Sequence, residues 1–429
     1  MPVVVGHRSS GHGLRHSRAT GGDGEDGGGL DPGRRTTACQ RERGRRDRRS
    51  PQLGHRQRDA GGADASLLAC VAAHRRIVRY GQPRRNRGAT DYRGPVLVDG
   101  AIGFDPADVV DTAVRAERDG YDGVWTAETA HDPFLPLALA AEHTRHIELG
   151  TGIAVAFARN PMTLATTAND LQTMSGGRFL LGLGSQIKPH IEKRFSMPWS
   201  HPAPRMRELV LAMRAIWASW ADGSRLAFRG EFYRHTLMTP MFDPGPNPHG
   251  PPKVFVAAVG PQMTEVAGEV ADGLLVHGFT TERYLREVSL PALERGLARA
   301  GKRRGDVQIS YPGMVVTGRD AAEVEVARKA VKAQLAFYGS TPAYRPVLEL
   351  HGWESLQPEL HALSRRGAWD EMADLVDDQM LDTFAVVGDL GEIPGKVRAR
   401  FGDVVDRFSF YAPYDVEPGR WSEILAGFK

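Results

Sequence analysis

Residues 179–184 read FLLGLG, an apolar run that follows the glycine pair Gly176-Gly177 and precedes Ser185. The glycine pair predicts the end of the helix before it. A strand that is apolar on both faces is typical of a parallel sheet whose two faces are covered by helices. The stretch therefore predicts a buried parallel strand, and it favours an α/β fold around that strand.

Strands and helices alternate on both sides of this run. The patterns Asp105-Pro106 and Asn160-Pro161 predict helix starts, because Asp or Asn accepts a hydrogen bond at the N-cap and proline fits the first turn. We expect strands at 96–103, 123–127, 147–157, 179–184, 254–259, 274–276, 309–316 and 404–411, and helices at 105–120, 133–141, 161–175, 205–220, 261–271 and 321–337. This predicts a (β/α)8 TIM barrel with insertions after strands 4 and 7 and a site at the C-terminal strand ends. An open doubly wound sheet is the alternative.

The composition changes near residue 93. Residues 1–93 hold 20 Arg, no Lys, 9 acidic residues, 16 of the 49 Gly and both cysteines, whereas residues 94–429 hold 35 basic and 43 acidic residues. Such a front segment cannot bury enough apolar area to offset about 1–2 kcal/mol per ordered residue. We predict a disordered Arg/Gly-rich segment over 1–93, inert or preceding the true start, and a barrel domain over 94–429. Residues 41–49 are rich in arginine, so the alternative is that the segment is an arm that binds nucleic acid.

Several classes of protein are excluded or disfavoured. Two cysteines in 429 residues exclude a disulfide scaffold. The sequence also has no run of about 18 apolar residues, so it predicts no membrane-spanning helix. The N-terminus shows no secretory signal, so we expect a cytoplasmic protein. Gly182-Leu183-Gly184 holds only two glycines of a dinucleotide fingerprint, and no Walker A, H-E-x-x-H or G-x-S-x-G pattern occurs. We therefore expect no metal ion and disfavour a hydrolase.

Polar residues and glycines gather at the predicted strand ends. Strand two ends at Glu128 and is followed by His131 and by Asp132, which fits a helix cap. By itself, His131 also suits an ordinary surface loop. Glycines recur at three further strand ends, in 150–152, 184–186 and 260–262. Backbone amides that point toward one barrel mouth suit a flat, phosphate-bearing cofactor.

Three motifs give the chain a family resemblance. Residues 120–128 with His131, residues 149–161 and residues 175–185 resemble the bacterial luciferase-like superfamily, and within it the branch that uses the deazaflavin coenzyme F420. The resemblance covers roughly 95–415 and implies a (β/α)8 barrel. It also implies an oxidoreductase that transfers a hydride between coenzyme F420 and a small organic substrate.

The resemblance also implies residue roles. His131 takes the position of the histidine that faces the redox-active ring, but two residues separate it from Glu128, where many relatives have the acid and the histidine adjacent. Glu128 is therefore the second catalytic candidate. Gly152-Ile153 matches the place of a non-proline cis peptide behind the ring. The remaining cofactor-binding candidates are Gly184, Ser185, Gln186, Gly260, Pro261 and Gln262.

Two alternatives stay open within the same superfamily. With FMN instead of F420, reduced flavin would meet oxygen and the protein would be a monooxygenase. A non-catalytic flavin-binding relative is the other alternative. We expect the protein to bind a small-molecule substrate, and we expect it to bind neither a membrane nor nucleic acid. Whether it forms a homodimer stays open.

Overall fold

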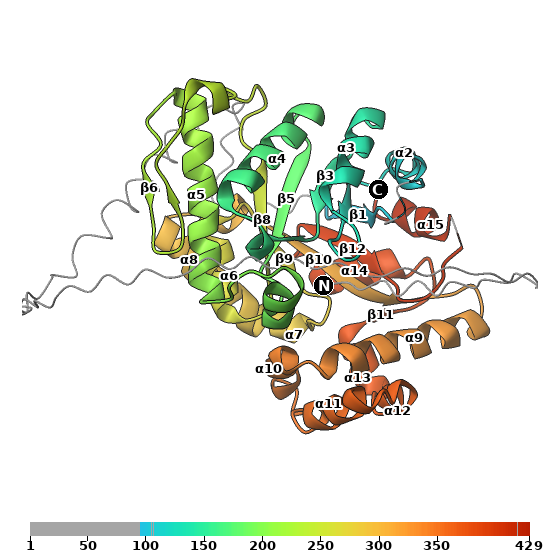
Figure 1. The fold of residues 1–429 in the computed structure, drawn as a ribbon. Helices are drawn as coiled ribbons and strands as arrows, with labels where there is room; N and C mark the ends of the chain where they lie inside the picture. The colour runs from blue at the N-terminus through green and yellow to red at the C-terminus, as the bar shows by residue number, and fades with distance from the viewer. Residues whose placement is uncertain (1–94, 104, 106, 418) are drawn as a thin grey trace, which may run out of the picture. The chain divides into compact units, whose positions relative to one another are not determined.

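The computed structural model describes residues 95–103, 105, 107–417 and 419–429, so the prediction for residues 1–93 lies outside the described residues. The described part forms a closed parallel barrel surrounded by helices (Figure 1). Its strands are β1 (Leu97–Ala101), β2 (Gly123–Thr126), β3 (Glu148–Thr151) with β4 (Ala154–Val155), β5 (Phe179–Gly184), β8 (Lys253–Ala258), β9 (Gly273–Val276), β10 (Gln308–Val316) and β12 (Arg407–Tyr411).

Strand pairing closes the barrel. The last strand, β12, pairs in parallel with β1 at Leu97↔Arg407 and with β10 at Ser310↔Arg407, while β10 also pairs with β9. An eight-stranded parallel sheet that returns to its first strand is a TIM barrel. The barrel prediction is therefore confirmed, and the open-sheet alternative is wrong.

Helices follow most of the strands. They are α2 (Val109–Asp119), α3 (Phe134–His143), α4 (Pro161–Met174), α6 (Pro261–Val270), α7 (Glu282–Tyr284), η4 (Leu285–Ser289), α8 (Leu290–Ala300), η5 (Arg304–Asp306), α9 (Ala321–Gly339), α14 (Ile393–Phe401) and α15 (Arg420–Ala426). The Asn160 side chain caps α4 as predicted, accepting from the Thr163 N–H at 3.0 Å. The helical stretch 282–300 after β9 was not predicted. In the part of the chain that is described, no helix has the length and apolar character to cross a bilayer.

Several expected boundaries differ from the structure by a few residues, and two of these differences have a clear structural cause. Helix α2 begins at Val109, and the Asp105 carboxylate accepts from the Ala107 N–H in a turn ahead of it, so Asp105 caps a turn and not the helix. The predicted strand at 147–157 is interrupted, because the peptide between Gly152 and Ile153 is cis and separates β3 from β4. The chain then forms a short helical turn, η1 (Ala156–Ala158).

Two long segments lie at the places where insertions were predicted. The first, between β5 and β8, holds η2 (His190–Arg194), α5 (Pro202–Asp222), the hairpin β6 (Phe228–Arg229) and β7 (Arg234–His235), and η3 (Pro240–Phe242). The second, after β10 and α9, holds η6 (Pro342–Tyr344), α10 (Arg345–Glu349), α11 (Leu356–Arg366), α12 (Trp369–Asp374), α13 (Asp378–Phe384) and β11 (Val386–Val387). Figure 1 shows α9 to α13 gathered on one side of the barrel.

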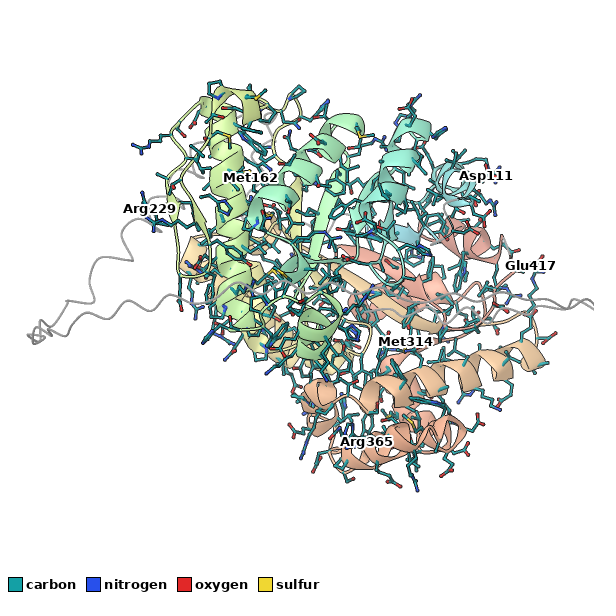
Figure 2. All side chains as sticks on the ribbon, viewed as in Figure 1. Asp111, Met162, Arg229, Met314, Arg365 and Glu417 are labelled. Carbon is teal, nitrogen blue, oxygen red and sulfur yellow. The ribbon has the colours of Figure 1, made fainter. Side chains whose placement is uncertain are left out.

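The second insertion shares a core with the barrel's C-terminal end. Its buried cluster includes Phe279 just beyond β9, Met314 of β10 and Tyr411 of β12. Figure 2, which labels Met314, shows this residue between the barrel and the helices of the insertion. The insertion is therefore packed onto the ends of three neighbouring barrel strands.

Large and small residues alternate inside the barrel. Trp125 of β2 reaches Phe255 of β8 across the interior, with ring centroids 5.6 Å apart in an edge-to-face arrangement. A Cβ at Gly150 would overlap the Trp125 indole, and one at Gly273 would overlap the Phe255 ring. These glycines are needed because the aromatic rings occupy the space their side chains would take.

Candidate active site

Glu128 follows β2, and its buried carboxylate is held through one oxygen. Its Oε2 accepts from the Val155 backbone N–H at 2.7 Å and from Arg159 Nη1 at 2.6 Å. Its own backbone N–H donates to the Ile153 carbonyl at 3.0 Å. Because these bonds join the end of β2 to β4 and η1, Glu128 fixes the chain around the cis peptide.

Asp132 and His131 differ in how they are held. Asp132 Oδ1 accepts from the Phe134 and Leu135 N–H groups at the start of α3, as its predicted capping role requires. Its Oδ2 lies 3.1 Å from Arg159 Nη2, which makes Arg159 a bridge between Asp132 and Glu128. His131 is exposed, and its ring makes no hydrogen bond or ion pair with any described residue. Its imidazole is therefore available at the end of β2.

Gly152, Ile153 and Gly184 come together at the mouth. Gly152 lies above the Trp125 ring, where a Cβ would be 3.5 Å from Trp125 Cε3. A Cβ at Gly184 would meet the Ile153 side chain at 2.7 Å. The cis peptide that the resemblance implies is present, and Ile153 packs directly against the end of β5.

The chain beyond β5 turns sharply at Ser185 and Gln186. Gln186 has φ of 61°, and its side-chain oxygen accepts from the Ile187 N–H at 3.0 Å. The Ser185 hydroxyl donates to the Gln186 carbonyl at 3.2 Å. Further along the first insertion, Arg194 donates to the Thr129 carbonyl, which links this insertion to the loop that carries His131.

Gly260, Pro261 and Gln262 lie at the end of β8, where α6 begins. Gly260 is the N-cap of α6, Pro261 is in its first turn, and Pro261 and Gln262 are exposed. A Cβ at Gly260 would meet no atom within 4 Å. The first turn of a helix carries N–H groups without partners inside the helix, which makes this open corner suited to an anion.

A further polar pair at the mouth was missed from the sequence. His277 follows β9, and its Nε2 lies 3.1 Å from the hydroxyl of Tyr344, which belongs to η6 of the second insertion. Burial lowers the pKa of His277 well below its usual value. The two residues are far apart in the chain and match no motif, so only the fold brings them together. No group of three metal-ligating side chains occurs among the residues the structure describes.

The comparisons with known proteins agree with this architecture. An uncharacterized protein of Mycobacterium tuberculosis is 61% identical over 310 residues, covering 72% of this chain and 91% of that protein. The 5,10-methylenetetrahydromethanopterin reductase of Archaeoglobus fulgidus is 30% identical over 283 residues, covering 64% of this chain and 80% of the reductase. The coenzyme F420-dependent tetrahydromethanopterin reductase of Methanopyrus kandleri has the same fold, with a TM-score of 0.63 at 21% identity over 78% of this chain and 97% of its own. The sequence profile described as luciferase-like monooxygenase matches residues 82–407, and the chain belongs to that family.

Proposed function

We propose that the protein is a coenzyme F420-dependent oxidoreductase that transfers a hydride between the coenzyme and a small organic substrate. The observation that carries this proposal is the open corner at Gly260, where a glycine without neighbours precedes the first turn of α6. Backbone approaches a ligand closely at such a position, and helix N–H groups favour a phosphate. Gly184 and the Gly152-Ile153 peptide lie at the same C-terminal end of the barrel and would face the ring.

The names of two relatives support F420 as the coenzyme. The solved Methanopyrus kandleri reductase is named as coenzyme F420 dependent, and a Mycobacterium tuberculosis protein that is 28% identical over 305 residues is named a putative coenzyme F420-dependent oxidoreductase. The family description names monooxygenases, which supports FMN as the competing coenzyme. A deazaflavin lacks the ring nitrogen needed for a stable oxygen adduct, so it supplies two-electron hydride chemistry.

We assign different roles to the two catalytic candidates after β2, the basic His131 and the acidic Glu128. The exposed imidazole of His131, which has no hydrogen-bond or ion-pair partner among the described residues, moves the proton that accompanies hydride transfer. Glu128 acts as a positioning residue, because its Oε2 already accepts from Arg159 and from the Val155 N–H. Ser185, Gln186, Pro261 and Gln262 complete the proposed coenzyme contacts.

The test is a titration of the purified full-length chain with F420 and with FMN, followed by absorbance and fluorescence. We expect saturable binding of F420 and at least about tenfold weaker binding of FMN, a difference of about 1.4 kcal/mol. Tighter binding of FMN, with oxygen consumption when the flavin is reduced, would support the monooxygenase instead. Binding of either coenzyme without any turnover across a broad substrate panel would favour the non-catalytic relative.

A further inference from the structure

We propose that Tyr344 and His277 form a substrate-binding pair in which the Tyr344 hydroxyl donates a hydrogen bond to an oxygen atom of an uncharged substrate. The pair deepens the proposed function and rests on it, because it places the substrate oxygen beside the barrel mouth that would hold the coenzyme. Tyr344 would touch the substrate, and His277 would position Tyr344.

Strand alternation places His277 at the mouth. Gly273 faces the Phe255 ring inside the barrel, and the Leu275 side chain reaches toward Gly182 of β5, which is not a neighbour of β9 in the sheet. Both residues therefore face the interior. Since side chains on one face recur every second residue, His277 continues this interior row where β9 ends.

The hydrogen bonds of His277 fix which ring nitrogen holds the proton. Its Nδ1 accepts from the Phe279 backbone N–H at 3.0 Å, so Nδ1 is unprotonated. A neutral imidazole then carries its proton on Nε2, and that N–H donates to the Tyr344 oxygen at 3.1 Å. Burial lowers the pKa of His277, which keeps this neutral form.

This tautomer leaves the Tyr344 proton free to donate. Among the described residues, His277 is the sole hydrogen-bond partner of the Tyr344 hydroxyl, and there the tyrosine oxygen is the acceptor. Burial raises the pKa of Tyr344 above its usual value, so the phenol stays protonated. A half-buried hydroxyl with an unused proton is a donor that a ligand can satisfy.

The surroundings of the pair favour an uncharged ligand. Tyr344 packs against the His277 ring at 4.5 Å, Phe279 at 5.9 Å and Tyr338 at 6.1 Å between centroids. None of these rings carries a charge, so none of them can supply the ionic partner that a buried carboxylate or phosphate needs. A ketone or aldehyde oxygen fits, because it accepts one hydrogen bond while the rest of the molecule contacts aromatic surface.

The test compares two ligands of nearly the same shape, cyclohexanone and methylenecyclohexane, of which only the ketone has an oxygen acceptor. Dissociation constants are measured by NMR on the full chain, with and without F420. Methylenecyclohexane is the more apolar ligand, so the ketone preference is read as the ratio of the two affinities in each variant compared with that in Tyr344→Phe. We expect this ratio to favour the ketone about two- to tenfold more in wild type than in Tyr344→Phe, the range of one neutral hydrogen bond. The control Tyr121→Phe, at the opposite end of the barrel, should keep the wild-type ratio.

Variants of His277 test its positioning role. His277→Gln can still accept from Phe279 N–H and donate to Tyr344, so it should keep most of the preference, and His277→Phe should lose it. The proposal is overturned if wild type binds neither ligand, or if Tyr344→Phe keeps the wild-type ratio of the two affinities. Failure of the proposed function would look different, because F420 would then not bind while the ligand preference could still be measured.

Discussion

Two arginine–carboxylate clusters lie at opposite ends of the same barrel. At the N-terminal end, Arg407 of β12 bonds Asp99 of β1 and Glu148 of β3, and the Arg407 and Asp99 side chains are completely buried. At the C-terminal end, Arg159 bonds Glu128 and Asp132, with 21% of the arginine side chain and 40% of the Asp132 side chain exposed. The chemistry of the two clusters is the same, but their access to water differs.

The difference in exposure to water distinguishes a cluster that stabilises the fold from a cluster beside the candidate active site. In the N-terminal cluster, which we call the lower cluster, Asp99 also accepts from Trp125 Nε1 at 2.8 Å, and a Cβ at Gly123 would overlap Arg407. The lower cluster is therefore tightly packed and closes the N-terminal end of the barrel. The upper cluster holds the loops around the cis peptide and leaves His131 free beside it. We therefore expect lower-cluster variants to change stability and upper-end variants to change chemistry.

The largest expected effect is at His131. His131→Ala should slow the chemical step by about 10²–10⁴-fold, since it removes the proposed proton carrier, while F420 affinity changes much less. Single-turnover rates with F420 measure this directly. Glu128→Gln is the matched variant, and we expect a smaller loss from it. If His131→Ala keeps its rate while Glu128→Gln loses it, the acid is the catalytic group.

Arg407→Met should give the largest loss of stability. Removing the guanidinium leaves the Asp99 carboxylate buried without its ionic partner, which costs about 3–5 kcal/mol in the free energy of unfolding. Urea denaturation measures the loss, and Asp99→Asn in the same chain should recover part of it. An Arg407→Met protein with wild-type stability would remove the distinction between the two clusters.

A pair of glycines gives the comparison a matched test. Gly150→Ala would force a methyl group into the Trp125 ring and should destabilise the fold by about 1–3 kcal/mol. Gly260→Ala meets no protein atom, so its stability should stay near wild type while F420 binds about tenfold more weakly, about 1.4 kcal/mol. Melting and F420 titration of both variants would separate the effects, and equal behaviour of the two would contradict our assignment of Gly260.

Asp132→Asn has the smallest expected effect. The amide can still accept from the Phe134 N–H, but its ion pair with Arg159 is lost. We expect a loss of about 1 kcal/mol or less in the free energy of unfolding and a nearly unchanged rate. A rate loss as large as that of His131→Ala would show that Asp132 belongs to the catalytic group.

The sequence was most informative where local patterns determine structure. The apolar run at 179–184, the Asn160-Pro161 helix start and the Asp132 cap were all predicted and are confirmed. The helix over 282–300 was missed even though Leu290, Leu293 and Leu297 repeat at helical spacing. That signal was present in the sequence and could have been used.

Long-range pairs could not be read from the sequence. Arg407 is a charged residue inside the strand predicted at 404–411, and its burial depends on Asp99, which is 308 residues away. His277 and Tyr344 are separated by 67 residues, and their contact depends on how the second insertion packs on β9. Such pairs follow from the closure of the barrel and not from any local motif.

Hydrogen–deuterium exchange with and without F420 tests the central claim most directly, because it reports both ends of the barrel in one experiment. We predict that F420 slows exchange in the loops at 127–131, 184–187 and 260–264, and leaves the N-terminal loops at 120–122, 145–147 and 271–272 unchanged. Slowed exchange at the N-terminal loops alone, or no change anywhere at saturating F420, would contradict a coenzyme site at the C-terminal mouth.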